Sequence, residues 1–132
     1  MADKREIFAT LQEALAEMLG IDTDDIKINS SLIEDLGAES LDLLNLTFQI
    51  EENFDVKIDP NEFSKAAASG LSEEELYEDD SRTFTSKGIE ALKKLMPEVP
   101  AEKFVEGLDR TKLPRLLTVE TFVNLVLRKK QD

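Results

Sequence analysis

Apolar residues recur at helical spacing along most of the chain, and they predict a protein built of helices. A first helix is expected over about residues 3–19, with Gly20 ending it. Its apolar face consists of Ile7, Leu11, Leu15 and Met18. A long loop is expected over about 20–39, and Ser31 with Glu34 fits a capping box for one short turn inside it.

The most apolar helix is predicted over about 40–53. We expect its apolar stripe to lie in the core, and it consists of Leu41, Leu44 and Phe48, widened by Leu43, Leu46 and Ile50. The opposite, polar face carries Asp42, Asn45, Gln49 and Glu52. The alternation that follows, over 54–58, is typical of a strand. It is too short to find a partner, so we interpret it as an extended connector.

The second half of the chain predicts several shorter helices. A third helix is expected over about 60–68, and a capping box at Ser72 and Glu75 begins another. Further helices are predicted over about 86–96 and 101–108, with Pro114 ending this region. The last helix is expected over about 119–130. Its inward residues are expected to be Val119, Phe122, Val123 and Val126.

Composition narrows the class of protein. The 132 residues carry a net charge of −13 and include neither His nor Cys, so disulfides and thiolate metal sites are excluded. We predict no metal site. A strongly acidic surface repels nucleic acid and anionic lipid, so we expect neither as a partner. The N-terminus lacks an apolar signal region and no stretch is long enough to span a bilayer. We therefore expect a cytoplasmic monomer.

One serine stands out against this acidic background. Ser40 follows a glycine turn and begins the apolar helix, in the run Asp35-Leu36-Gly37-Ala38-Glu39-Ser40-Leu41-Asp42. A serine in this position is by itself most often an N-cap. The run resembles the prosthetic-group site of acyl carrier proteins, in which Asp usually stands where this chain has Glu39. The resemblance implies that Ser40 carries 4′-phosphopantetheine, which holds acyl groups as thioesters.

The resemblance also implies a fold. Acyl carrier proteins are bundles of three longer helices and one short helix, and residues 3–58 and 118–130 match that plan. We therefore expect an all-α, acyl-carrier-like four-helix bundle with additional short helices inserted between the third and last bundle helices. Residues 1–132 would form a single carrier domain that contains an extended third-helix region and insertion over 61–115.

The resemblance further implies a carrier rather than an enzyme, whose partners are a phosphopantetheinyl transferase and acyl-transferring or acyl-elongating enzymes with basic docking patches. The expected partner-binding residues are Asp35, Glu39, Asp42, Asn45, Glu51 and Glu52. The expected walls of an acyl-chain pocket are Leu44, Phe48, Ile50, Phe54, Phe122 and Val126. The family usually has Glu at Asn45 and an aliphatic residue at Thr47, which favours a specialised fatty acid, lipid or polyketide pathway.

Several alternatives stay open. The chain could be an acidic helical interaction module that keeps the bundle but is never modified. The insertion could form a roof that enlarges the acyl pocket, a docking platform for a dedicated partner, or a solvated loop. A solvated loop would leave Ile89, Leu92 and Phe104 exposed. Calcium binding at residues 22–25 fails the EF-hand pattern, because Ile26 and Lys27 occupy positions that need an oxygen donor and glycine.

Overall fold

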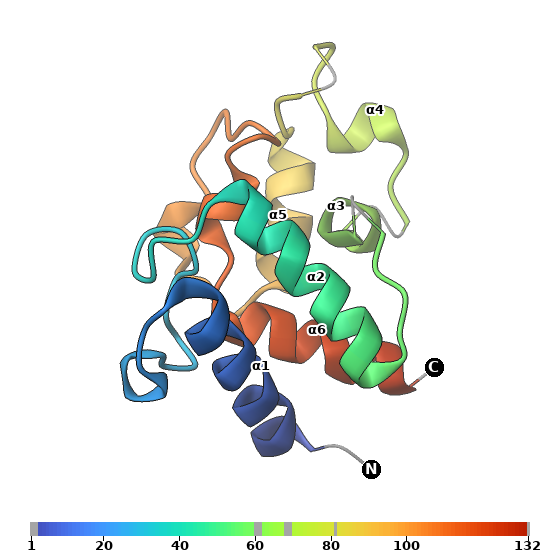
Figure 1. Ribbon diagram of the computed structural model, residues 1–132. Coiled ribbons are helices and arrows are strands. Elements are labelled where there is room, and N and C mark those ends of the chain that lie inside the picture. The colour runs from blue at the N-terminus through green and yellow to red at the C-terminus, as the bar shows by residue number, and fades with distance from the viewer. Residues whose placement is uncertain (1–2, 60–61, 68–69, 81, 132) are drawn as a thin grey trace. The chain divides into compact units, whose positions relative to one another are not determined.

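The computed structural model describes residues 3–59, 62–67, 70–80 and 82–131, which form helices joined by loops (Figure 1). The α-helices are α1 (Lys4–Leu19), α2 (Ser40–Phe54), α3 (Glu62–Ala67), α4 (Glu73–Leu76), α5 (Ser86–Leu95) and α6 (Val119–Gln131). The 3₁₀ helices are η1 (Thr23–Asp25), η2 (Ala101–Lys103) and η3 (Leu113–Leu116). Bridges between described residues are isolated and form no strand, so the all-α prediction is confirmed. None of the helices described here has the length and apolar composition needed to cross a membrane.

The chain divides into two compact units. The first unit consists of Met1–Ile58 and Leu117–Asp132, and the second unit consists of Asp59–Leu116. The first unit therefore contains α1, η1, α2 and α6, whereas the second unit contains the remaining helices. The single carrier domain with an insertion over 61–115 stays a prediction.

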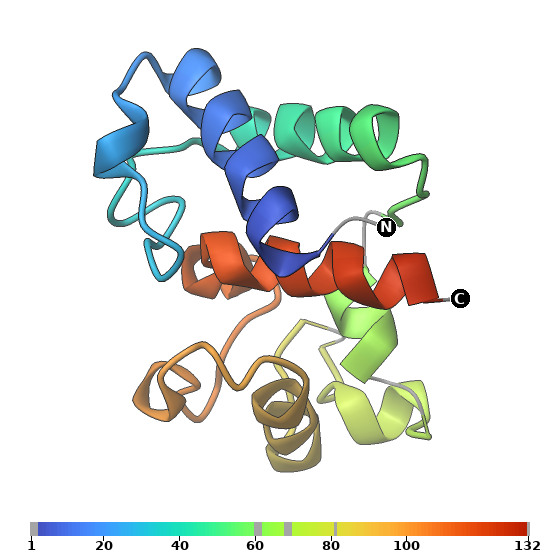
Figure 2. The same ribbon diagram turned by 90° about the horizontal axis from the view of Figure 1, so that it is seen from below.

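Helix α1 of the first unit begins and ends where the sequence predicts. The Asp3 carboxylate accepts a hydrogen bond from the Glu6 backbone N–H at 2.9 Å and caps the start. Gly20 ends the helix in the left-handed conformation, at φ 69°, which favours glycine. The buried residues of α1 are Ile7, Leu11 and Leu15. Helix α1 packs against α2 and α6 (Figure 2), so the predicted inner face is confirmed for these three residues, whereas Met18 is half-buried.

The start of α6 is joined to the loop before α2 by backbone pairing. Ser31 and Thr118 form an isolated antiparallel bridge, and the Leu32 N–H donates to the Leu117 carbonyl at 3.1 Å. The inward residues predicted for α6 are all buried, namely Val119, Phe122, Val123 and Val126. Residues 117–131 therefore complete the core of the first unit, although the whole second unit separates them from residue 58 in the sequence.

The second unit has its own set of buried apolar side chains. They are Leu76, Phe84, Ile89, Leu92, Met96, Val99, Phe104, Leu108, Leu113 and Leu116. Helices α3 and α4 both pack against α5. Isolated bridges join Tyr77 to Phe84 and Thr83 to Asp109. The interpretation of this region as a solvated loop is therefore wrong.

The prediction of a helix over 101–108 is also wrong. Only the 3₁₀ turn η2 forms, in which the Phe104 N–H donates to the Ala101 carbonyl three residues earlier. Gly107 then adopts φ 82°, which a continuing helix does not allow. Phe104 and Leu108 are nevertheless both buried. The apolar spacing that suggested a helix is thus also compatible with a turn that buries both side chains. The helix predicted over 60–68 is described as α3, and positions 60, 61 and 68 lie outside the described residues.

Candidate functional site

Helix α2 begins without a hydrogen bond from the side chain of Ser40. Glu39 is the N-cap residue, and its backbone N–H donates to the Asp42 carboxylate at 2.8 Å. The Glu39 carbonyl accepts the Leu43 N–H at 3.1 Å, which is the first bond of the helix. Gly37, at φ 75°, turns the chain into this start. Ser40 is thus the first residue of α2, and the expectation from a lone serine, an N-cap, does not hold here.

The Ser40 side chain is exposed, and no described residue makes a hydrogen bond with its hydroxyl. The backbone N–H groups in the first turn of a helix lack carbonyl partners within it, and the helix dipole favours negative charge there. A phosphate ester on Ser40 would stand at this end of a 15-residue helix. The residues present therefore fit a prosthetic group that is attached through phosphate.

Helix α2 presents apolar side chains on two different faces. Leu46 and Ile50 are buried. Leu41, Leu44 and Phe48 are 75%, 50% and 56% exposed, and we call these three residues the apolar row. The prediction that all of these residues line the core is therefore wrong for the apolar row. Residues 41, 44 and 48 follow helical spacing on a face well away from that of 46 and 50, so α2 cannot bury both sets against α1.

The residues expected to wall an acyl pocket are not brought together. Leu44 and Phe48 are exposed and Phe54 is half-buried. The remaining three are in the core, namely Ile50, Phe122 and Val126. The sequence could not separate these groups, because both faces of α2 are apolar. The sequence indicated an outward apolar face in one way only: this helix has more Leu and Phe residues than one buried stripe needs.

Three of the residues expected to bind partners also hold the local structure. The Asp35 carboxylate accepts the Ser31 N–H at 2.7 Å, and the Glu51 carboxylate accepts the Ile58 N–H at 2.8 Å. Asp42 holds the start of α2, as described above.

The other three residues of that set are Glu39, Asn45 and Glu52, and all three are exposed. The side chains of Asn45 and Glu52 make no hydrogen bond or ion pair with a described residue. These two are therefore free to meet a partner.

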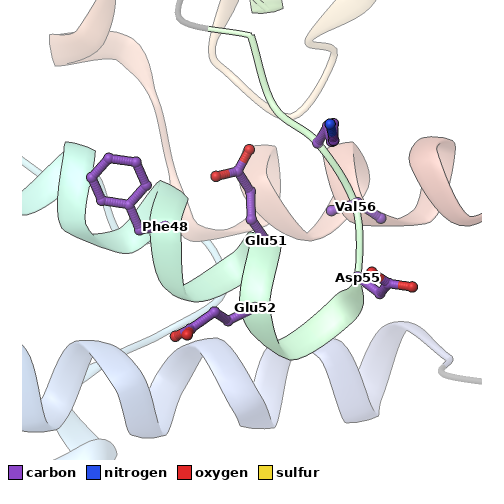
Figure 3. A pocket seen from close by; sticks show the side chains of 6 residues that line it. Phe48, Glu51, Glu52, Asp55 and Val56 are labelled. Carbon is purple, nitrogen blue, oxygen red and sulfur yellow. The ribbon is translucent and has the colours of Figure 1, made fainter.

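An open hollow of about 840 Å³ lies beside the C-terminal half of α2 (Figure 3). It is lined by Phe48, Glu51, Glu52, Asp55, Val56 and Lys57. Phe48, the last residue of the apolar row, thus also lines this hollow, next to the acidic side chains of Glu51, Glu52 and Asp55. Despite this acidity, the described residues contain no group of three Asp or Glu side chains placed to hold a metal ion.

The segment that contains Ser40 lies in the part of the chain that matches a known family. A family model described as a phosphopantetheine attachment site matches residues 9–81. The acyl carrier protein of Clostridium acetobutylicum is 41% identical over 64 residues, which are 48% of this chain and 83% of that protein. The acyl carrier protein of Thermotoga maritima is 39% identical over 70 residues, which are 53% of this chain and 86% of that protein.

A third relative extends the same likeness. The acyl carrier protein of Campylobacter lari is 42% identical over 59 residues, which are 45% of this chain and 77% of that protein. The matched region contains both the turn before α2 and α2 itself. Membership of this family implies interaction with a phosphopantetheinyl transferase and with acyl-handling enzymes. The chain therefore belongs to the acyl carrier protein family and carries covalently attached 4′-phosphopantetheine.

Proposed function

We propose that Ser40 is the residue to which 4′-phosphopantetheine is attached. The observation that carries this proposal is an exposed serine hydroxyl at the start of α2 that takes no part in capping the helix. The other serines of the preceding loop are Ser30 and Ser31, and both are buried. Ser31 also accepts the Glu34 N–H through its hydroxyl at 3.2 Å. Ser40 is thus the serine of this segment that a transferase can reach.

We infer that the protein is a carrier and not a catalyst. The bound group supplies a terminal thiol on which acyl chains are held as thioesters. The chain itself contains neither His nor Cys, and among the described residues no acidic or basic side chain makes a hydrogen bond with the Ser40 hydroxyl. The base that removes the Ser40 proton therefore comes from the transferase. The contribution of the chain is to present the serine on a rigid helix end.

We propose that partner enzymes bind the outward face of α2. The apolar row begins next to Ser40 and follows the helix at positions i, i+3 and i+7. Asn45 and Glu52 offer free polar groups beside it. This surface fits an enzyme that presents an apolar contact with basic residues around it. Because Asn45 is neutral, it weakens the electrostatic attraction to a basic partner, which favours an enzyme of a specialised fatty acid, lipid or polyketide pathway.

The burial pattern narrows the side chains that could shelter an acyl chain. We propose that Ile50, Phe122 and Val126, with the half-buried Phe54, are the candidates, because Leu44 and Phe48 belong to the outward face. Sheltering an acyl chain contributes about 0.8 kcal/mol for each buried methylene. A medium-length chain would therefore be held firmly until a partner binds.

The charge of the chain sets the remaining partner classes. A net charge of −13 repels phosphate-rich surfaces, so we propose that neither nucleic acid nor an anionic membrane is a partner. The same repulsion between copies favours a monomer.

The test of the attachment site is intact mass after incubation with coenzyme A and a broad-specificity phosphopantetheinyl transferase. We expect the chain to gain the mass of one phosphopantetheine and Ser40→Ala to gain none. Ser86→Ala is the matched control, since Ser86 is also the exposed first residue of a helix. Modification that persists in Ser40→Ala, in a folded protein, would contradict the proposal.

A further inference from the structure

The family match ends at residue 81, yet two helices inside it pack against a helix beyond it. Helices α3 and α4 lie within the matched residues 9–81, and both pack against α5. We infer that α5 is the structural support of α3 and α4. The segment after residue 81 is thus needed for α3 and α4 to be stable, and it is not an appendage to a carrier domain that folds without it. This inference is independent of which residue carries the prosthetic group.

Helix α3 is too short to be stable by its own hydrogen bonds. It spans six residues, and isolated helices shorter than about 12 residues are marginal in water. One local interaction lies at its start, where the Asp59 N–H donates to the Glu62 carboxylate at 3.0 Å. Lys65 also pairs with the Asp59 carboxylate at 2.9 Å. These bonds hold the first turn, and α3 packs against α5.

The end of α4 is locked to the start of α5. Thr85 caps α5 by accepting the Gly88 N–H on its hydroxyl at 3.0 Å, and the same hydroxyl donates to the Glu75 carbonyl. The Thr85 N–H donates to the Leu76 carbonyl at 3.0 Å. A Cβ atom added to Gly88 would lie 2.5 Å from that carbonyl oxygen. Glycine at position 88 therefore allows a backbone contact that no other residue permits without a shift.

Helix α5 is buried on one side and exposed on the other. Gly88, Ile89 and Leu92 are buried, while Lys94 on its other side is exposed. Loss of packing on the buried side of α5 would therefore be felt in α3 and α4, which pack against it. The segment after residue 81 thus supports two helices that lie within the family match.

The test is hydrogen exchange by mass spectrometry on the full chain with Leu92→Ala, which removes a fully buried side chain from α5. Gly88→Ala is a second, smaller change, which acts on the contact with Leu76. Lys94→Ala is the matched control, because it changes the exposed face of the same helix. Modification of Ser40 by the transferase is measured in every variant, so that a failure of this inference is distinguishable from a failure of the attachment site.

We expect Leu92→Ala to lower protection of residues 62–67 and 73–76 as much as that of residues 86–95, by roughly 30-fold or more. Residues 40–54 should keep their protection, and Lys94→Ala should change none of these segments. Protection that persists in 62–67 while 86–95 loses it would overturn the inference. If the Leu92→Ala chain does not fold, the same comparison between 62–67 and 86–95 in Gly88→Ala decides.

Discussion

The Asp42 carboxylate accepts a hydrogen bond from the backbone N–H of Glu39 at 2.8 Å, and this pair flanks Ser40 on both sides. The helix end is therefore held by its two acidic neighbours, and the serine hydroxyl between them is left for chemistry. If Ser40 carries the prosthetic group, as we propose, then capping and modification belong to neighbouring residues and are separable by mutation.

The first prediction follows from that separation. Asp42→Ala should lower the free energy of unfolding by about 0.5–2 kcal/mol, because the capping box of α2 loses the carboxylate that accepts the Glu39 N–H. Ser40→Ala should change it by less than about 0.5 kcal/mol, because an exposed hydroxyl without a partner is lost. Urea unfolding followed by NMR of the amides in 40–54 measures both values. Equal destabilisation by the two variants would show that Ser40 does support the helix.

The two apolar faces of α2 predict opposite phenotypes for truncation. Leu46→Ala should destabilise the first unit by about 2–5 kcal/mol, because Leu46 is 1% exposed and its loss leaves a cavity. Phe48→Ala should leave stability within about 0.5 kcal/mol. It should lower kcat/KM of the phosphopantetheinyl transferase roughly tenfold if Phe48 is an anchor of the docking face. Thermal unfolding and transferase kinetics on both variants test this, and an unchanged kcat/KM for Phe48→Ala would remove the apolar row from docking.

Two neighbouring glutamates at the end of α2 should differ in how much their removal lowers stability. Glu51→Ala should cost about 1 kcal/mol of stability, because the carboxylate no longer accepts the Ile58 N–H. Glu52→Ala should leave stability unchanged, because its exposed carboxylate makes no interaction with a described residue. Both should weaken binding to a basic partner, and the weakening by Glu52→Ala should diminish as salt screens the charge. Binding of the transferase at low and high salt, beside thermal unfolding, gives both quantities.

A pH-dependent contribution to stability is expected in the second unit. Hydrogen bonds from the backbone N–H groups of Thr83 and Arg82, and from the Thr83 hydroxyl, lower the pKa of Asp80 from 3.8 to about 2. A carboxyl whose pKa is lower in the folded chain stabilises the fold when it is ionised. This contribution is fully present above about pH 4 and is lost as the pH falls towards 2.

Asp80→Asn should therefore lower the Tm of the second unit at pH 6, and the difference from the unchanged chain should shrink below pH 4. Asp79→Asn is the matched control, because the exposed Asp79 side chain makes no hydrogen bond or ion pair with a described residue. Tm measured from pH 6 down to 3 in the three proteins tests the direction. A difference that grows on acidification would contradict the assignment.

Short-range patterns in the sequence were enough to identify where α1 and α4 begin and to recognise the segment around Ser40. Asp3 and Gly20 bound α1, and Ser72 with Glu75 begins α4, because caps depend on residues within one turn of each other. The run around Ser40 is equally local, and its resemblance to acyl carrier proteins agrees with the family match. Local hydrogen bonding and helical spacing decide such features before any packing occurs.

Long-range packing decided what local spacing left ambiguous. Both faces of α2 are apolar, and only the contacts with the rest of the first unit determine that Leu46 is buried while Phe48 is exposed. The turn at 101–108 replaces a helix because Gly107 reverses the chain while Phe104 and Leu108 are buried. Likewise α3 gains its support from α5, about 20 residues further along the chain. These outcomes depend on side chains distant in sequence competing for one interior, and no local pattern records which of them fills it.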